Sequence, residues 1–202
     1  MPPGRPRTFD TDAALDAAVD VFWRRGYRRT TTRDLESALG LGQSSISSAF
    51  GSKVDLADRV FGRYLERLDA GLIAPLRQAP DGLAAIDRFL AGLGEWHAAD
   101  GGRGCLVGRF AADGAGAEPR LAARLAQHRT ALRRALDAAL ERAARDGEID
   151  GDDRGTHRDL VVAVVLGLNL ALQAGYRPGA HAALVRAGRA QVAAWAATAP
   201  GA

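Results

Sequence analysis

A short run of small polar side chains in the first quarter of the chain is dense in hydrogen-bonding groups. Residues 43–48 read Gln-Ser-Ser-Ile-Ser-Ser, and helical spacing puts Ile46, Ala49 and Phe50 on one face with serines opposite. A serine hydroxyl can bond several base edges, and a glutamine amide suits adenine. Such a helix can enter the major groove of double-stranded DNA, with Gln43, Ser44, Ser45, Ser47 and Ser48 as the candidates for base contacts. Taken alone, the pattern is more typical of a solvated surface.

Hydroxyl and basic residues flank this run at positions suited to phosphate. A helix is expected to start at Thr30-Thr31-Thr32, and the backbone N–H groups at a helix N-terminus favour anions. A further helix is expected to open at Lys53. The predicted phosphate contacts are Thr31, Thr32, Arg33 and Lys53.

The segment from Met1 to Thr8 holds three prolines and two arginines and has no apolar period, which predicts a flexible basic arm. Arg5 and Arg7 are expected to enter the narrow minor groove of A·T-rich DNA. The net charge adds little to this argument. At +3 it is too small to indicate a nucleic-acid partner by itself.

The residues give weaker support to a calcium site, a zinc site or a hydrolase site. Asp146–Gly151 has the acids and glycine of a calcium loop, but His157 stands at position twelve, where a bidentate glutamate is required. The histidines lack zinc-site spacing. A hydrolase would have to use Cys105 with His97 or His128 as base, and no third member or oxyanion motif accompanies them. We therefore expect no metal, no cofactor and no catalytic site.

The composition favours helices throughout. Alanine supplies 42 of the 202 residues, and the aromatic residues that favour strands make up only 6% of the chain, so an all-α fold is predicted. A single cysteine forms no internal disulfide, and with no apolar N-terminal stretch the expected location is the cytoplasm. The apolar run Leu160–Leu172 is shorter than the roughly 20 residues of a membrane-spanning helix. No membrane association is expected.

Cap and stop residues divide the chain into about nine expected helices. The first is expected to be capped by Thr11 or Asp12 and to end at Gly26, and the second is expected to end at Gly40. After the helix of the serine run, Ser52 is expected to cap a long helix. Five further helical segments are expected at about residues 83–99, 104–113, 119–145, 157–176 and 180–197.

The N-terminal third resembles the TetR family of bacterial transcriptional repressors. The residues that carry the resemblance are Phe9-Asp10, Ala13-Ala14-Leu15, Phe22-Trp23, Gly26-Tyr27, Thr30-Thr31, Arg33-Asp34-Leu35, Ala38, Gly40-Leu41, Phe50-Gly51-Ser52-Lys53 and Asp55-Leu56. The resemblance implies a helix-turn-helix DNA-binding domain over residues 9–54, after the arm of residues 1–8, and a helical effector-binding and dimerisation domain over residues 55–202. The family spacing of these residues favours a DNA contact by residues 43–48 over a solvated surface. One position departs from the family: Ser47 stands where a tyrosine is common.

The resemblance also implies a dimer joined through the last two helices. A dimer fits DNA recognition, because one head reads only a few base pairs and two heads span two half-sites. The run from Leu160 to Leu172 is apolar nearly all round, so one side can face the core and the other a partner chain. The candidate interface residues are Leu160, Val161, Val164, Leu168, Leu184, Ala187, Gln191 and Trp195.

The resemblance also implies a cavity among the middle helices that binds a small, largely apolar effector. Asn169 and Gln173 lie one turn apart on an otherwise apolar helix, where they would orient a ligand or bond across a helix interface. The candidate lining residues are Phe89, Trp96, Cys105, Phe110, Leu132, Leu136, Asn169 and Gln173.

These observations predict a transcriptional regulator, and not an enzyme, that binds a palindromic operator as a dimer and is released by a small molecule. Two alternatives stay open on the residues alone. One is an all-α small-molecule-binding protein without DNA activity, and the other is a hydrolase that depends on Cys105.

Overall fold

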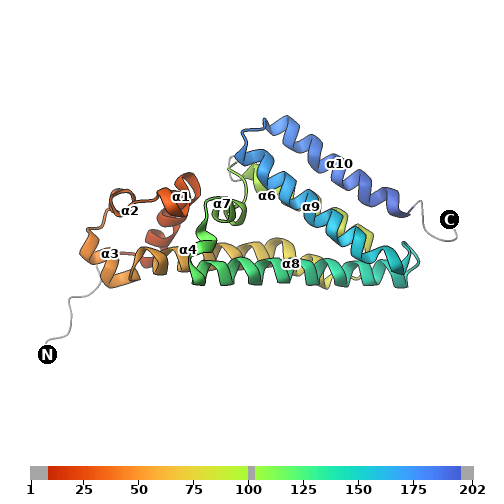
Figure 1. Cartoon of the computed structure of the whole chain (residues 1–202), viewed down its shortest axis with the longest axis horizontal. Coiled ribbons are helices and arrows are strands. Elements are labelled where there is room, and N and C mark those ends of the chain that lie inside the picture. Colours follow the sequence, from red (N-terminus) through yellow and green to blue (C-terminus); the bar gives the residue numbers. More distant parts are fainter. Residues whose placement is uncertain (1–8, 100–102, 197–202) are drawn as a thin grey trace, which may run out of the picture.

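The computed structural model describes residues 9–99 and 103–196, and this part of the chain is helical without strands (Figure 1). A head of short helices lies at one end of an elongated helical body, which confirms the all-α prediction. The elements are α1 (Thr11–Arg29), α2 (Thr32–Leu39), α3 (Gln43–Phe50), α4 (Lys53–Leu68), a π-helical turn (Asp69–Ile73), α5 (Ala74–Gln78), α6 (Leu83–Ala99), α7 (Leu106–Ala112), α8 (Pro119–Arg145), α9 (Arg154–Gln173) and α10 (Pro178–Ala196).

The head helices begin and end at residues with recognisable capping chemistry. The cap of α1 is Asp10, whose carboxylate accepts from the N–H groups of the second and third helical residues. The expected cap, Thr11 or Asp12, is wrong, because both residues lie inside the helix. Gly26 has φ 78° and interrupts α1, three residues before it ends. Gly40 ends α2 in the left-handed conformation, as expected.

The helix that begins at Lys53 joins the head to the body. It passes from α4 through the π-helical turn into α5 with helical backbone at both junctions, so the ten α-helices of the described residues form nine rods. The proposed domain boundary between residues 54 and 55 falls in its first turn. Head and body therefore share one continuous helix.

The body helices match the expected segments to within about three residues at each end. The loop that superficially follows a calcium site instead caps its neighbours. Glu148 accepts from the backbone N–H of Leu83 at the start of α6, and Asp150 accepts from the N–H of Asp152 before α9. Both carboxylates satisfy helix ends that would otherwise lack partners.

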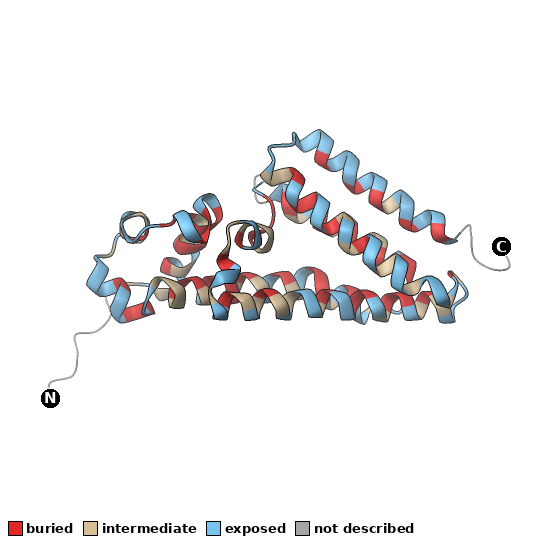
Figure 2. Ribbon diagram, in the orientation of Figure 1, coloured by how far each residue is buried: buried red, intermediate tan, exposed pale blue. Residues whose placement is uncertain are grey.

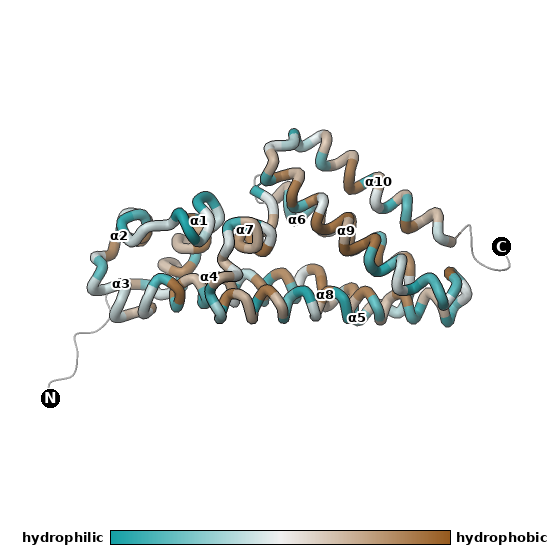
Figure 3. The backbone as a smooth tube through the Cα atoms, viewed as in Figure 1, coloured by the Kyte–Doolittle hydropathy of each residue, from teal (hydrophilic) through white to brown (hydrophobic). Residues whose placement is uncertain are grey.

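The core runs without interruption from the head into the body. Helix α1 packs against α4, and buried residues recur along α4, α6 and α8. Figure 2 shows buried and exposed positions alternating along α8. Helix α9 is hydrophobic along much of its length (Figure 3), yet its Leu166 and Leu170 side chains are exposed. The most polar segments lie in the head and at the far end of α8.

Candidate nucleic-acid interface

The outer face of α3 presents the side chains that the sequence predicted. Ile46, Ala49 and Phe50 are buried against the head, which turns the opposite face to solvent. That face is made of the exposed residues Gln43, Ser44, Ser45, Ser47 and Ser48. A helix with short polar side chains on its exposed side can approach base edges closely.

The N-terminus of α2 lies in the same head and is closed by a capping box. The Thr31 hydroxyl accepts from the Asp34 N–H, and the Asp34 carboxylate accepts from the Thr31 N–H at 2.9 Å. The bond from the Thr31 backbone N–H, followed by that from its hydroxyl, holds the pKa of Asp34 below its usual value. Thr32 and Arg33 are exposed beside this cap, at the helix end where phosphate binds.

Lys53 contacts the end of α1. Its ammonium group lies 4.7 Å from the ring centre of Tyr27 and donates to the Arg28 carbonyl at 3.4 Å. Burial lowers the pKa of Lys53. Lys53, which was predicted to contact phosphate, therefore also helps to hold α1 against α4. The two arm residues, Arg5 and Arg7, lie outside the described residues.

Helix α7 and the residues on either side of it tie the body to the head. The Trp23 indole donates to the Gly104 carbonyl at 3.1 Å, and the Asp113 carboxylate accepts from the Arg28 N–H at 2.6 Å. Arg109 donates to the Arg24 carbonyl at 3.1 Å. These bonds connect α7 and its flanking residues to the C-terminal half of α1.

Phe110 of α7 completes this joint, although the sequence analysis placed it in an effector cavity. Its side chain is fully buried, and its ring packs against Phe22, Tyr27 and Phe61 at centroid distances of 4.8–6.2 Å. Two of these three rings belong to α1. Phe110 therefore contributes to the contact between head and body.

Ion pairs between α4 and α8 reinforce the joint. Arg120 pairs with Asp55, and Arg124 forms a two-pronged pair with Asp58. The Arg124 guanidinium holds the pKa of Asp58 below its usual value. Nearby, the Tyr27 hydroxyl donates to Glu118 at 3.0 Å, and burial together with that bond raises the pKa of Tyr27 to about 12.

The apolar effector candidates lie in the body core. Phe89, Leu132 and Leu136 are buried among other apolar side chains. Trp96 is half-buried, and its indole donates to the Tyr64 hydroxyl at 3.1 Å. That hydroxyl donates in turn to the Cys105 sulfur at 3.3 Å.

The polar candidates Asn169 and Gln173 lie against α7, where a Cβ added to Gly108 would be 2.9 Å from the Gln173 amide nitrogen. His97 and His181, which the sequence analysis left out, join this region from α6 and α10. Their ring nitrogens are 3.1 Å apart, and both rings are buried. Because these two residues are 84 positions apart in the chain, no local pattern signals their contact.

The buried His97 predicts a pH-dependent stability. Burial, followed by the neighbouring His181, lowers the pKa of His97 from 6.5 to about 4. The unfolded chain therefore binds the proton more readily, and the stability present above pH 6.5 is lost as the pH falls towards 4. The full loss is roughly 3 kcal/mol, of which about 2 kcal/mol is expected between pH 7 and pH 5.

Urea unfolding at pH 7 and at pH 5 measures this effect against a His97→Gln variant. The pH 5 limit lies above the lowered pKa values of carboxyl groups such as Asp58 and Asp87, so their protonation adds little to the difference. The wild-type free energy of unfolding should fall more steeply than that of the variant. Equal slopes would contradict the prediction.

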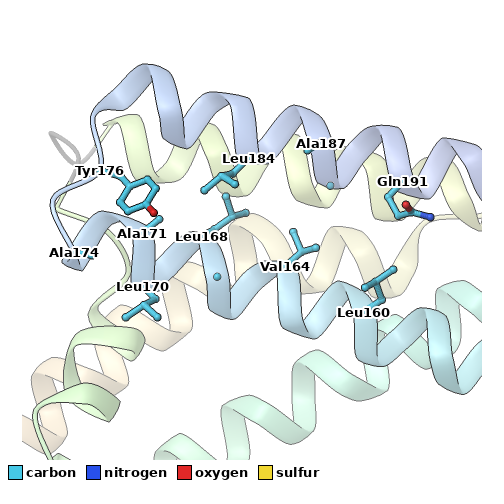
Figure 4. A pocket seen from close by; sticks show the side chains of 12 residues that line it. Leu160, Val164, Leu168, Leu170, Ala171, Ala174, Tyr176, Leu184, Ala187 and Gln191 are labelled. Atoms are coloured by element: carbon cyan, nitrogen blue, oxygen red, sulfur yellow. The ribbon is translucent and has the colours of Figure 1, made fainter.

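The outward side of α9 and α10 forms an apolar groove of about 590 Å³ (Figure 4). Five of the predicted interface residues line it, namely Leu160, Val164, Leu184, Ala187 and Gln191. Its lining also includes Leu170 and Tyr176, which the sequence analysis left out. We call this surface the α9–α10 face.

Three of the predicted interface residues are turned into the chain instead. Val161 and Leu168 are almost fully buried, although Leu168 reaches the floor of the groove. Trp195 is buried and stacks on His157 with ring centres 4.0 Å apart. Leu166, 62% exposed, and Leu170, 64% exposed, hold the outward positions of α9.

Comparison with known proteins decides the family. The model of bacterial regulatory proteins of the tetR family matches residues 14–60, and the model of the tetracyclin repressor-like C-terminal domain matches residues 82–188. The second match alone covers more than half of the chain. The chain belongs to the TetR family. This confirms the resemblance, for the body as well as the head.

Individual relatives agree with the TetR assignment. The HTH-type transcriptional repressor ComR of Escherichia coli is 42% identical over 67 residues, which cover 33% of this chain and 32% of ComR. The HTH-type transcriptional repressor BdcR of the same organism is 30% identical over 106 residues, or 52% of this chain and 54% of BdcR. The alignments thus span less than two thirds of these curated relatives.

A solved structure of a TetR family member aligns along almost the whole chain. The regulator CifR, as a cysteine mutant complexed with a 26 bp double-strand operator DNA, is 28% identical. The match covers 95% of this chain and all of the CifR chain, with a TM-score of 0.82. The likeness therefore includes the relative placement of head and body.

Proposed function

We propose that this TetR family protein is a cytoplasmic transcriptional repressor that binds a palindromic operator as a homodimer and is released by a small molecule. The observation that carries DNA recognition is the outer face of α3, where every exposed side chain is polar and small enough to enter the major groove. Arg33 and the amides of α2 would bind the adjacent phosphates. The operator-bound form of CifR supports the same use of the head.

A second copy of the chain is the partner that fits the α9–α10 face. Leu170 and Tyr176 line the groove and are each more than half exposed, and Leu166 is 62% exposed one turn before Leu170 on α9. Exposed apolar patches of this kind mark interfaces. Two antiparallel pairs of helices would close over these side chains as a four-helix bundle. The two heads would then lie on the same side of a duplex, in reach of successive half-sites.

Helix α9 has the length and composition of a membrane-spanning helix. Within the described residues, the stretch Gly151–Gln173 is long and apolar enough to cross a bilayer. Asn169 is buried within it, and charged residues Arg154, Arg158 and Asp159 occupy its first turns. A protein interface accounts for its exposed leucines with these polar groups in place.

We propose that the effector binds in the body where α6, α7 and α9 meet. The buried polar side chains of His97 and Asn169 lie next to each other there, and a ligand could accept or donate hydrogen bonds at this pair. Helix α7 lies between these residues and α1. A ligand that displaces α7 would change the angle of the two heads and favour the form released from DNA.

Footprinting of the purified protein on its own genomic DNA tests the proposal directly. The expected result is protection of inverted repeats upstream of a few genes, at about 0.1 M salt. The alternative of a ligand-binding protein without DNA activity predicts no protected site. The hydrolase alternative has little support, because the Cys105 thiol is buried and its sulfur accepts from the Tyr64 hydroxyl.

The Arg33→Ala variant should weaken binding to all duplexes by a similar factor. Arg33 is exposed beside the N-terminus of α2, so its loss removes one phosphate contact and no base contact. The slope of log affinity against log salt should become shallower by about one. A loss confined to one DNA sequence, with the slope unchanged, would instead show that Arg33 reads a base.

A further inference from the structure

The recognition helix α3 begins without a side-chain cap of its own. Its N-cap residue is Gly42, which has no side chain to accept a hydrogen bond. The N–H of Gln43 instead donates to the Glu36 carboxylate of α2, with an N–O distance of 2.7 Å. The first free amide of α3 is thus satisfied from the preceding helix.

This bond spans the glycine-containing turn between α2 and α3. The connection between α2 and α3 contains Gly40, in the left-handed conformation, and Gly42, and neither glycine has a neighbour within 4 Å of an added Cβ. Among the described residues, the bond from Gln43 to Glu36 is the side-chain hydrogen bond that links the two helices. A helix of only eight residues depends on such external contacts for its stability and orientation.

We propose that Glu36 is a positioning residue that fixes the angle of α3 on α2 and so raises the discrimination between operator and other DNA. The proposal rests on the DNA recognition proposed above. A carboxylate at a helix N-terminus is attracted by the helix dipole, and the bond is charge-assisted. Base readout requires α3 in one orientation, whereas phosphate attraction tolerates several.

The negative charge of Glu36 also favours operator DNA over other DNA. A negative charge beside the surface that meets DNA repels every duplex alike, so it weakens binding that relies on phosphates alone. On operator DNA, the base contacts of the oriented α3 offset this repulsion. Glu36 should therefore lower non-specific affinity while supporting specific affinity.

The test compares Glu36→Ala with Glu36→Gln on two probes. One is the duplex that the wild-type protein selects from a random-sequence pool, and the other is a scrambled duplex of the same length and composition. Glu36→Ala should bind the selected duplex about tenfold more weakly and the scrambled duplex up to about threefold more tightly. Glu36→Gln keeps an acceptor oxygen and should stay within about threefold of wild type on the selected duplex.

A rescue variant separates orientation from helix capping. Gly42 has the extended backbone of a normal N-cap and open space for a Cβ, so Gly42→Ser can cap α3 internally. In the Glu36→Ala background it should restore the Tm, but the ratio of the two affinities should stay low. Full restoration of the ratio, or an unchanged ratio in Glu36→Ala alone, would overturn the proposal. Failure of the wild type to select any duplex would instead refute operator binding itself.

Discussion

A Leu170→Arg variant should be a monomer and should bind its operator about a thousandfold more weakly than the wild type. Leu170 is 64% exposed on the α9–α10 face, so the arginine is tolerated by the folded chain but places a charge in the proposed interface. Losing the dimer removes one of the two half-site contacts. The remaining affinity should approach the non-specific range, which lies at least about a thousandfold above specific dissociation constants.

Light scattering measures the mass, and fluorescence anisotropy with the selected duplex measures the affinity. Gln127→Arg is the matched control, because it adds the same charge at an exposed position of α8 outside the proposed interface. The control should remain dimeric and bind normally, and both variants should keep the wild-type helix content. A Leu170→Arg protein that stays dimeric would show that the interface lies elsewhere.

A Ser47→Glu variant should lose operator binding to a similar extent while remaining a dimer. Ser47 is exposed on the outer face of α3, where a glutamate is a good helix former and meets no buried surface. In the complex its carboxylate would face base edges and phosphates in the major groove. Repulsion and the loss of close approach together should reduce binding by about a thousandfold, to the non-specific level or below.

The matched control places the same residue elsewhere in the head. Ala38 is exposed on α2 in a groove that Arg24 and Arg25 of α1 also line, so Ala38→Glu adds an equal charge near favourable partners. It should bind the selected duplex within a few-fold of wild type. If both variants lose binding equally, the effect is general charge repulsion, and α3 has no special place in recognition.

Local signals in the sequence were sufficient to predict most of the fold. Gly40 and Ser52 mark their helix ends by chemistry contained within a few residues, and the structure uses both in that way. The exposed face of α3 follows from the spacing of Ile46, Ala49 and Phe50 alone. These features depend on residues within one helix or at its ends, so they can be predicted from a single sequence.

Features that depend on contacts between elements could not be predicted in the same way. Phe110 has the same apolar character as a ligand-lining residue, and only the packing of α7 on α1 assigns it to the head–body joint. Helix α9 is apolar nearly all round, so its sequence does not say which side faces outward. For that reason Val161 was placed at the interface and Leu170 was omitted.

The π-helical turn at Asp69–Ile73 has a consequence for exchanging parts between relatives. It inserts extra length into the single rod from Lys53 to Gln78, so the rotational phase of the head relative to the body depends on the residue count in this turn. Adding or deleting one residue in an α-helix turns everything beyond it by about 100°. In a hybrid regulator that combines this body with the head of a relative, the head would keep its orientation relative to the body only if the residues of this turn are retained.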